Sequence, residues 1–159
     1  MLITRERILS LKPCYELKDI EKLIPEQGII TETDDSCLER LLKLSRGDAR
    51  WLLSNLLSPE SCLEWAEASI RRAQVYVDVT IRKANDDDYL SELITAARAV
   101  GIAWSKLQQK ENKEEITWGR WWCKKAITTS CLIAINNNQS VEEHTKAMQH
   151  GIDLLNREI

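Results

Sequence analysis

The sequence predicts an all-α fold, in which residues 1–159 form a single domain of about seven helices with a long central antiparallel hairpin. Three observations support this prediction. Only five glycines and three prolines punctuate the chain, and most of them stand between segments of regular pattern. Within those segments, apolar residues recur at three- and four-residue steps, which is the period of an amphipathic helix. A hydrophobic fraction of 43% beside 30% charged residues is typical of a globular chain.

The N-terminal third of the chain is broken into short pieces. Thr4 to Leu11 and Tyr15 to Ile24 predict two short helices, the first stopped by Pro13 and the second by Pro25. The extended stretch from Gly28 to Thr33 predicts a short strand, although no partner strand is evident.

Two further short helices are expected between Asp34 and Leu57, separated by a break at Ser45 to Asp48. Asp48 is expected to cap the second of them. Two short helices that meet at a glycine superficially match a helix-turn-helix. The second helix, however, carries Trp51 and four leucines, and it is too apolar to lie in a DNA major groove. A DNA-reading role is therefore not expected.

The rest of the chain predicts long helices. Ser58 to Glu60 is a helix start, because serine caps, proline suits the first turn and glutamate suits the positive end of the helix dipole. The helices Pro59 to Lys83 and Asp88 to Gln109 form the expected hairpin. Two more helices follow, one from Ile116 to Ile135 and one from the capping box at Ser140 to Leu155.

Charge and cysteine content exclude several classes of protein. Lys and Arg number 22 against 25 Asp and Glu, and this net charge of −3 supplies no global field for nucleic acid or anionic membranes. No segment approaches the roughly 20 apolar residues of a membrane span, and no signal peptide is expected. Five cysteines without a CxxC pair favour a cytoplasmic setting over a disulfide framework. We also expect no metal and no cofactor, because the closest cysteines are eight residues apart and the two histidines six apart, which does not match the ligand spacing of zinc sites.

Glu64 and Glu67 form a carboxylate pair with the spacing that magnesium-dependent, all-helical nucleotide phosphohydrolases use. The second pair expected of such an enzyme is not found in the following helix, where Asp88 and Glu92 are four residues apart at a helix start that favours carboxylates anyway. His144 and His150 lie six residues apart, on different faces of the last helix and without a nucleophile motif, so both are expected at the surface. We therefore expect no enzyme and assign no catalytic residue, with the phosphohydrolase kept as an alternative.

Six tryptophans in a chain without phenylalanine are its most distinctive feature. Five of them fall on apolar stripes and are expected in the core: Trp51, Trp65, Trp104, Trp118 and Trp122. The sixth, Trp121, points roughly 100° away from Trp122 and lies beside Arg120, Lys124 and Lys125. Two interpretations remain open: Trp121 packs on a neighbouring helix, or it forms an exposed aromatic and basic patch. Since Trp and Arg are enriched at interface hot spots, such a patch predicts a protein partner before single-stranded nucleic acid.

The acidic turn that contains Asp86, Asp87 and Asp88 is a second candidate surface. Three carboxylates in one turn concentrate negative potential and would suit a cationic partner. The commoner role of such a triplet is to cap a helix and keep a turn hydrated. The candidate partner-binding residues are therefore the four around Trp121 and, secondarily, these three aspartates.

Three short motifs carry a resemblance to a known group of proteins: Lys12-Pro13-Cys14-Tyr15, Cys62-Leu63-Glu64-Trp65-Ala66, and Asn85 to Asp88 followed by Ala96-Ala97-Arg98-Ala99. Over residues 4 to roughly 105, in patches, the chain resembles small all-helical immunity proteins of bacteria, which are encoded beside polymorphic toxins, and related prophage proteins. The resemblance implies a non-enzymatic role in which the protein neutralises a toxin or effector by steric occlusion. The alternative is a phage- or prophage-encoded inhibitor of a host defence system. The stretch from Ile116 to Ile135 departs from the Ala- and Trp-rich repetitive helices that the family carries there.

Overall fold

Eight helices and one two-stranded sheet make up the part of the chain that this computed structural model describes, residues 1–13, 17–31, 33, 35–84, 88–109, 111–135 and 140–158. The elements are β1 (Leu2–Ile3), α1 (Arg5–Ser10), α2 (Leu17–Leu23), β2 (Ile29–Ile30), α3 (Cys37–Leu42), α4 (Arg46–Leu56), α5 (Pro59–Ala84), α6 (Asp88–Leu107), α7 (Lys113–Ile135) and α8 (Ser140–Arg157). The predicted all-α fold is confirmed. No described helix is both long and apolar enough to cross a membrane.

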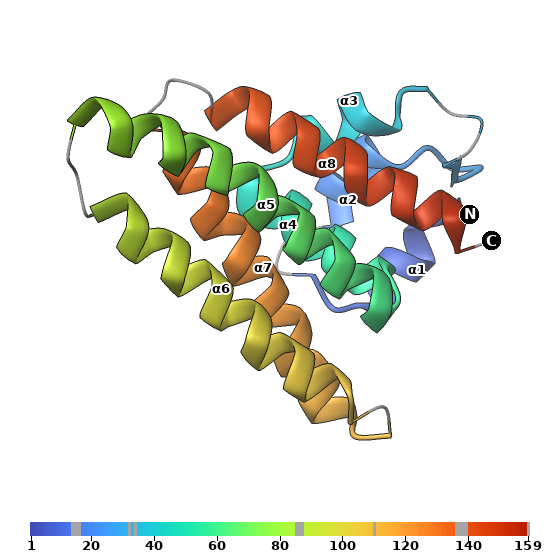
Figure 1. Cartoon of the computed structure of the whole chain (residues 1–159). Helices are drawn as coiled ribbons and strands as arrows, with labels where there is room; N and C mark the ends of the chain where they lie inside the picture. Colours follow the sequence, from blue (N-terminus) through green and yellow to red (C-terminus); the bar gives the residue numbers. More distant parts are fainter. Residues whose placement is uncertain are drawn as a thin grey trace.

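The three longest helices form the body of the fold. Figure 1 shows α5 and α6 running antiparallel and side by side, as the sequence predicted, with α7 packed behind them and α8 along the other side of α5. Among the described elements, α6 and α7 share the most extensive contact. The α6–α7 hairpin projects beyond the short N-terminal helices, which gather at the opposite end near α8 (Figure 1).

Small side chains line the surfaces where α5, α6 and α7 meet. The buried positions are Cys62, Ala66, Ser69 and Ala73 on α5, Ala96, Ala99 and Ala103 on α6, and Gly119, Cys123, Ala126, Ser130 and Ala134 on α7. A Cβ added at Gly119 would stand 2.5 Å from Cγ of Leu107, so glycine is needed for α6 and α7 to approach this closely. Because the small residues take the inner faces, the large side chains of the hairpin are directed elsewhere.

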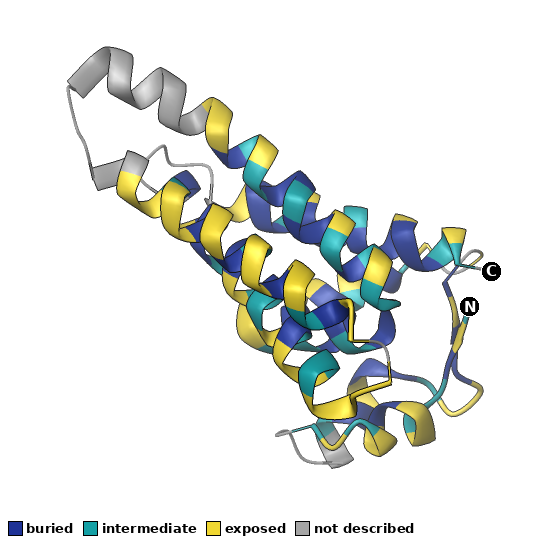
Figure 2. Cartoon of the chain, turned by 60° about the horizontal axis from the view of Figure 1, so that its bottom comes forward, coloured by how far each residue is buried: buried dark blue, intermediate teal, exposed yellow. Residues whose placement is uncertain are grey.

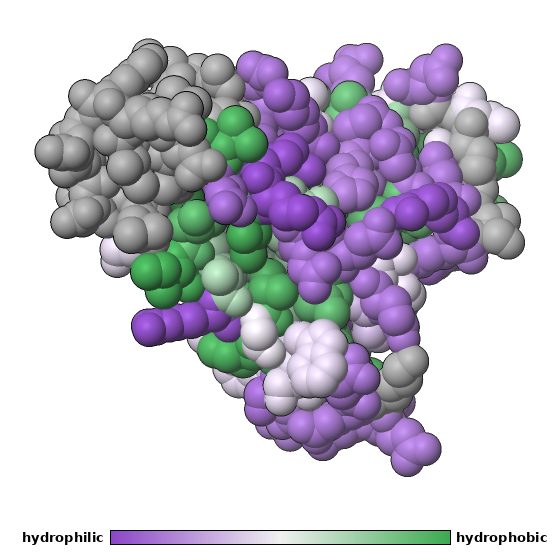
Figure 3. Space-filling model, viewed as in Figure 1, coloured by the Kyte–Doolittle hydropathy of each residue, from purple (hydrophilic) through white to green (hydrophobic). Residues whose placement is uncertain are grey.

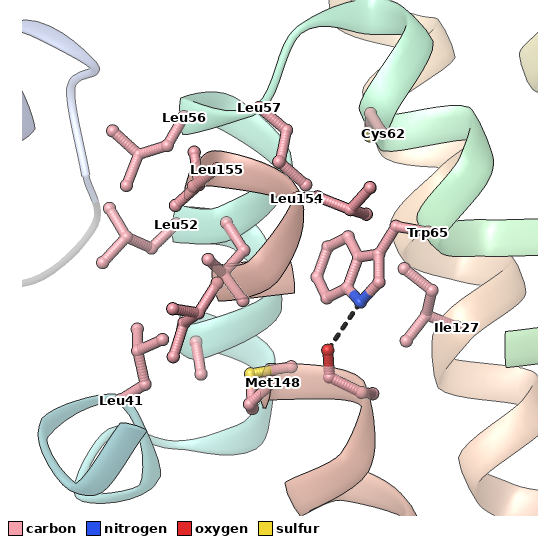
Figure 4. Packing of buried hydrophobic residues seen from close by; sticks show 14 of the residues in the cluster. Leu41, Leu52, Leu56, Leu57, Cys62, Trp65, Ile127, Met148, Leu154 and Leu155 are labelled. Carbon is pink, nitrogen blue, oxygen red and sulfur yellow. Dashed lines mark hydrogen bonds between the residues drawn. The ribbon is translucent and has the colours of Figure 1, made fainter. Parts of the chain in front are cut away.

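The large apolar side chains gather instead where α4, α5 and α8 meet. Trp65 is fully buried there, and its indole Nε1 donates a hydrogen bond to the Ala147 carbonyl at 2.7 Å (Figure 4). Figure 4 shows it among Leu57, Leu154 and Ile127. The buried indole nitrogen is thus satisfied by the backbone of α8, which ties α5 to α8.

A two-stranded sheet joins the N-terminal segments, and the sequence predicted only one of its two strands. Ile29–Ile30 forms the expected strand, and its partner is Leu2–Ile3, in antiparallel register Leu2↔Ile30 and Ile3↔Ile29. Gly28 has φ +81°, and a Cβ there would stand 2.9 Å from the Ile3 carbonyl oxygen, so this turn requires glycine. A two-residue strand is too short to show an alternating pattern, which is why the partner was not evident.

The break between α3 and α4 lies where it was expected, but the capping residue is different. Ser45 is the N-cap of α4, and its Oγ accepts a hydrogen bond from the Asp48 backbone N–H at 3.1 Å. Asp48 was expected to cap this helix and lies inside it. Serine and aspartate are both good caps, so the residue type alone did not distinguish the two positions.

Candidate partner-binding surface

The outer faces of the α6–α7 hairpin carry three exposed tryptophans. Trp104 on α6 is 56% exposed, and Trp118 and Trp121 on α7 are 49% and 42% exposed. Figure 2 shows long runs of exposed positions along this hairpin, with buried positions facing inward. The exposed interpretation of Trp121 is therefore correct, whereas the placement of Trp104 and Trp118 in the core was wrong. Trp65 is buried as predicted, and Trp51 and Trp122 are half-buried against the core.

Trp118 was misplaced because a different face of α7 packs inward than the sequence predicted. Trp118 and Trp122 were expected inside because they are large, apolar and one helical turn apart on the same face. The observed inner face is rotated by one position, to Gly119 and Cys123, because small residues permit the close approach of α6 and α5. Trp118 and Trp121 consequently share an outward stripe with Lys125.

The tryptophans of α7 are in contact with one another. The rings of Trp118 and Trp121 lie edge to face, with centroids 6.1 Å apart and planes at 75°. Trp121 and Trp122 lie edge to face as well, with centroids 4.8 Å apart and planes at 88°. Trp118, Trp121 and Trp122 therefore form a row of contacting rings, which we call the tryptophan row. Since Trp122 packs against the core, it fixes the position of this row on α7. Each such pair adds about 0.5–1.5 kcal/mol beyond area burial, so the exposed rings are held in place before any partner arrives.

Arg120 lies under this row and is bound to α4. Its Nη1 donates to the Ser54 carbonyl and, at 2.6 Å, to the Leu57 carbonyl, at the end of α4 where backbone carbonyls lack helical partners. This placement favours a cation, because the C-terminal end of a helix is electronegative. Arg120 therefore positions α7 against α4, while Lys125 is exposed and Lys124 is half-buried beside the tryptophan row.

The second candidate surface is the acidic turn before α6, and the structure describes only its last residue. Asp86 and Asp87 lie outside the described residues. Asp88 is the first residue of α6, and its side chain is likewise outside the described part. The structure therefore brings Arg120, Trp121, Lys124 and Lys125 together on one helix, and it does not describe how the acidic turn faces them.

Trp104 belongs to a different face of the hairpin. It lies one helical turn before Gln108, which with Leu63 and Pro59 of α5 lines a small cavity. Ile94, on the same side of α6, is also exposed. Figure 3 shows a hydrophobic area along α6 in this view. The hairpin thus has an apolar face toward α5 and an aromatic and basic face on α7.

The carboxylate pair proposed as a magnesium site is partly engaged. Glu64 Oε1 accepts from Arg157 Nη2 at 2.7 Å, in an ion pair between α5 and α8. Glu67 is half-buried. Among the described residues, no group of three or more His, Cys, Asp and Glu side chains could hold a metal ion.

His144 is not at the surface, contrary to the sequence-based expectation. It is 5% exposed, and burial, aided by the charges of Arg50 and Arg46, lowers its pKa to about 4. His150 is half-buried, and burial lowers its pKa as well. The expectation was wrong because positions 143 and 144 of α8 face inward: Glu143 is fully buried as well and pairs with Arg72 of α5 at 2.7 Å. Arg50 was also missed, although it lies between the core positions Ala49 and Leu53 of α4.

The fold and this surface define an all-helical bundle with a projecting, tryptophan-bearing hairpin. No protein-family model, no curated protein and no solved structure matches the chain. The function is therefore argued from the chemistry of the described surface.

Proposed function

We propose that this protein is a binding module that neutralises a toxin or effector protein by steric occlusion, in the manner of an immunity protein. The observation that carries the proposal is the anchored row of Trp118, Trp121 and Trp122 on α7, with Lys125 beside it. Large exposed rings are costly to leave in water, and tryptophan is the residue most enriched at the centres of protein interfaces.

The chemistry of the row specifies its partner. Two exposed indoles need an apolar hollow on the other protein, and the lysines at positions 124 and 125 need carboxylates at its edge. Because Trp122 holds Trp121 in place, little side-chain entropy is lost on binding. An inhibitor of a host defence effector would use the same surface, and the gene next to the one that encodes this chain distinguishes the two roles.

The decisive experiment measures binding of the toxin encoded by the neighbouring gene to three variants of the full chain. Trp121→Ala and Trp118→Ala each remove an indole from the proposed surface. Trp104→Ala removes an indole of similar exposure from the other face of the hairpin and is the matched control. Hot-spot losses of about 2 kcal/mol predict a Kd about 30-fold weaker for the α7 variants and unchanged for the control.

Two results would contradict the proposal. If only Trp104→Ala weakened the complex, the binding surface would be the face toward α5. If the wild-type chain bound neither the neighbouring toxin nor a defence effector of its host, occlusion of a protein partner would be rejected.

A further inference from the structure

A polar cluster is buried where α4, α7 and α8 meet. Arg50 of α4 and His144 of α8 are each 5% exposed, and Cys131 of α7 is also buried. Arg50 Nη1 donates to Thr128 Oγ1 of α7 at 3.1 Å, and the guanidinium also interacts with the Cys131 side chain. The cluster is therefore built by three helices that are far apart in the sequence, and the tryptophan row does not explain it.

Three buried nitrogens of this cluster lack a hydrogen-bond partner among the described residues. Within the described residues, Arg50 Nε has no hydrogen-bond partner, and neither ring nitrogen of His144 has one. No carboxylate of the described chain forms an ion pair with Arg50. Glu143, the residue before His144, is held by Arg72. Among the described residues, no carboxylate therefore pairs directly with this buried positive charge, which is unfavourable unless another group supplies a negative charge.

The surroundings of the cluster are positive. Arg46, one turn before Arg50 and exposed, adds a second cation, and both arginines act with burial to keep His144 neutral. Burial raises the pKa of the Cys131 thiol, so no thiolate balances Arg50. The described charged groups of the cluster are therefore Arg50 and Arg46 beside His144 and the Arg72–Glu143 ion pair, which acts on Cys131, and their sum is positive.

We propose that this cluster binds one small anion, held by the unpartnered Nε–H of Arg50 and by a ring N–H of His144. An anion at this position would accept from the unpartnered donors and neutralise the buried guanidinium. The ligand class is a monovalent ion such as chloride or nitrate, because both side chains are 95% buried and a phosphate ester would need an open mouth. The bound ion would join α4 to α8 beside the Thr128 contact with α7.

The first experiment compares thermal unfolding in gluconate, chloride, nitrate and phosphate buffers at equal ionic strength. Gluconate is the reference because it is too large to enter the cluster. We expect the Tm of the wild-type chain to rise by about 3 °C or more in 0.1 M chloride or nitrate. Arg50→Met should lose this rise and should be no less stable than wild type in gluconate, since the unpaired cation is gone. Arg7→Met removes the same charge from an exposed site on α1 and should keep the rise.

The second experiment needs no variant. Side-chain NMR of histidine measures the pKa of His144 in gluconate and in chloride or nitrate, with His150 as the internal reference. A bound anion favours the imidazolium form, so the pKa of His144 should rise while that of His150 stays constant.

The proposal is overturned if wild type and Arg50→Met show the same rise in Tm, which would indicate general screening. It is also overturned if the rise occurs only in phosphate, or if no anion shifts the Tm. If Arg50→Met does not fold in any buffer, the histidine titration decides: an unchanged pKa of His144 rejects the site.

Discussion

Trp65 and Trp121 are two tryptophans with opposite burial in the folded chain. Each has both apolar and charged residues as its sequence neighbours. Trp65 lies where α5 meets α4 and α8, among leucines that leave room for an indole, and it is fully buried. Trp121 lies on a helix whose inner face is built from small residues, and it is 42% exposed. The difference teaches that the spacing of the helices, rather than the hydrophobicity of the side chain, decides which tryptophan enters the core.

The largest expected effect is the loss of the buried ring. Trp65→Ala should lower the free energy of unfolding by about 3–5 kcal/mol, because it leaves a cavity and removes the hydrogen bond to Ala147. Trp121→Ala should cost about 1–3 kcal/mol, the value of its two edge-to-face pairs with Trp118 and Trp122. Urea unfolding followed by circular dichroism measures both. Equal losses would show that Trp121 supports the fold as Trp65 does.

The buried His144 should make the free energy of unfolding depend on pH. The pKa of His144 is about 4 in the folded chain and about 6.5 when unfolded, so folding favours the neutral imidazole. The contribution of His144 to the free energy of unfolding is fully present above pH 6.5. It is lost as the pH falls from 6.5 toward 4, and the free energy of unfolding decreases by about 3 kcal/mol over this window. Urea unfolding in gluconate at several pH values measures this slope.

His144→Gln is the control for the pH effect, because glutamine cannot titrate. The slope between pH 6.5 and 4 should be shallower in this variant than in wild type. An identical slope would assign the pH dependence to other groups.

Substitutions at two glycines test whether the close approach of α6 and α7 keeps the tryptophans of α7 exposed. Gly119→Ala places a Cβ against Leu107 and should cost about 1–3 kcal/mol by overpacking the α6–α7 contact. Gly101→Ala, on the outer side of α6, meets nothing within 4 Å and should stabilise the chain by about 0.5–1 kcal/mol. Thermal unfolding of the two variants gives opposite signs if the close approach of α6 and α7 is real. A stabilising Gly119→Ala would contradict it.

The smallest expected effect concerns the emission of the exposed rings. Acrylamide should quench Trp104, Trp118 and Trp121 most strongly and leave Trp65 protected, since the first three are exposed and Trp65 is fully buried. Trp121→Ala should remove part of the quenchable emission and leave the protected part unchanged. Complete protection of every tryptophan from acrylamide would refute the exposed row.

Much of the fold could be predicted from local signals. The start of α5 at Pro59 and the antiparallel pairing of α5 with α6 follow from caps, breaks and apolar periodicity. The pairing of β1 with β2 could not be predicted, because it joins two residues to two others across a long stretch of chain. Of the candidate site, Trp121 and Lys125 were placed at the surface correctly. Arg120 was expected beside Trp121 as part of the patch, but its partners are carbonyls of α4 that are 63 and 66 residues away.

The sequence by itself determined that this protein is a helical bundle, where α5 begins, and that α5 and α6 form a hairpin. These properties depend on neighbours within one or two turns, and their signals are therefore local. The start of α7 was expected at Ile116 and lies at Lys113. Only the tertiary structure decided which stripe of α6 and of α7 faces inward, and with it the exposure of Trp104 and Trp118 and the burial of Arg50 and His144. A helix with apolar residues on two faces can bury either one, and the choice depends on how closely its neighbours approach. In α7 the small residues at positions 119 and 123 allow that approach, so the tryptophans remain outside.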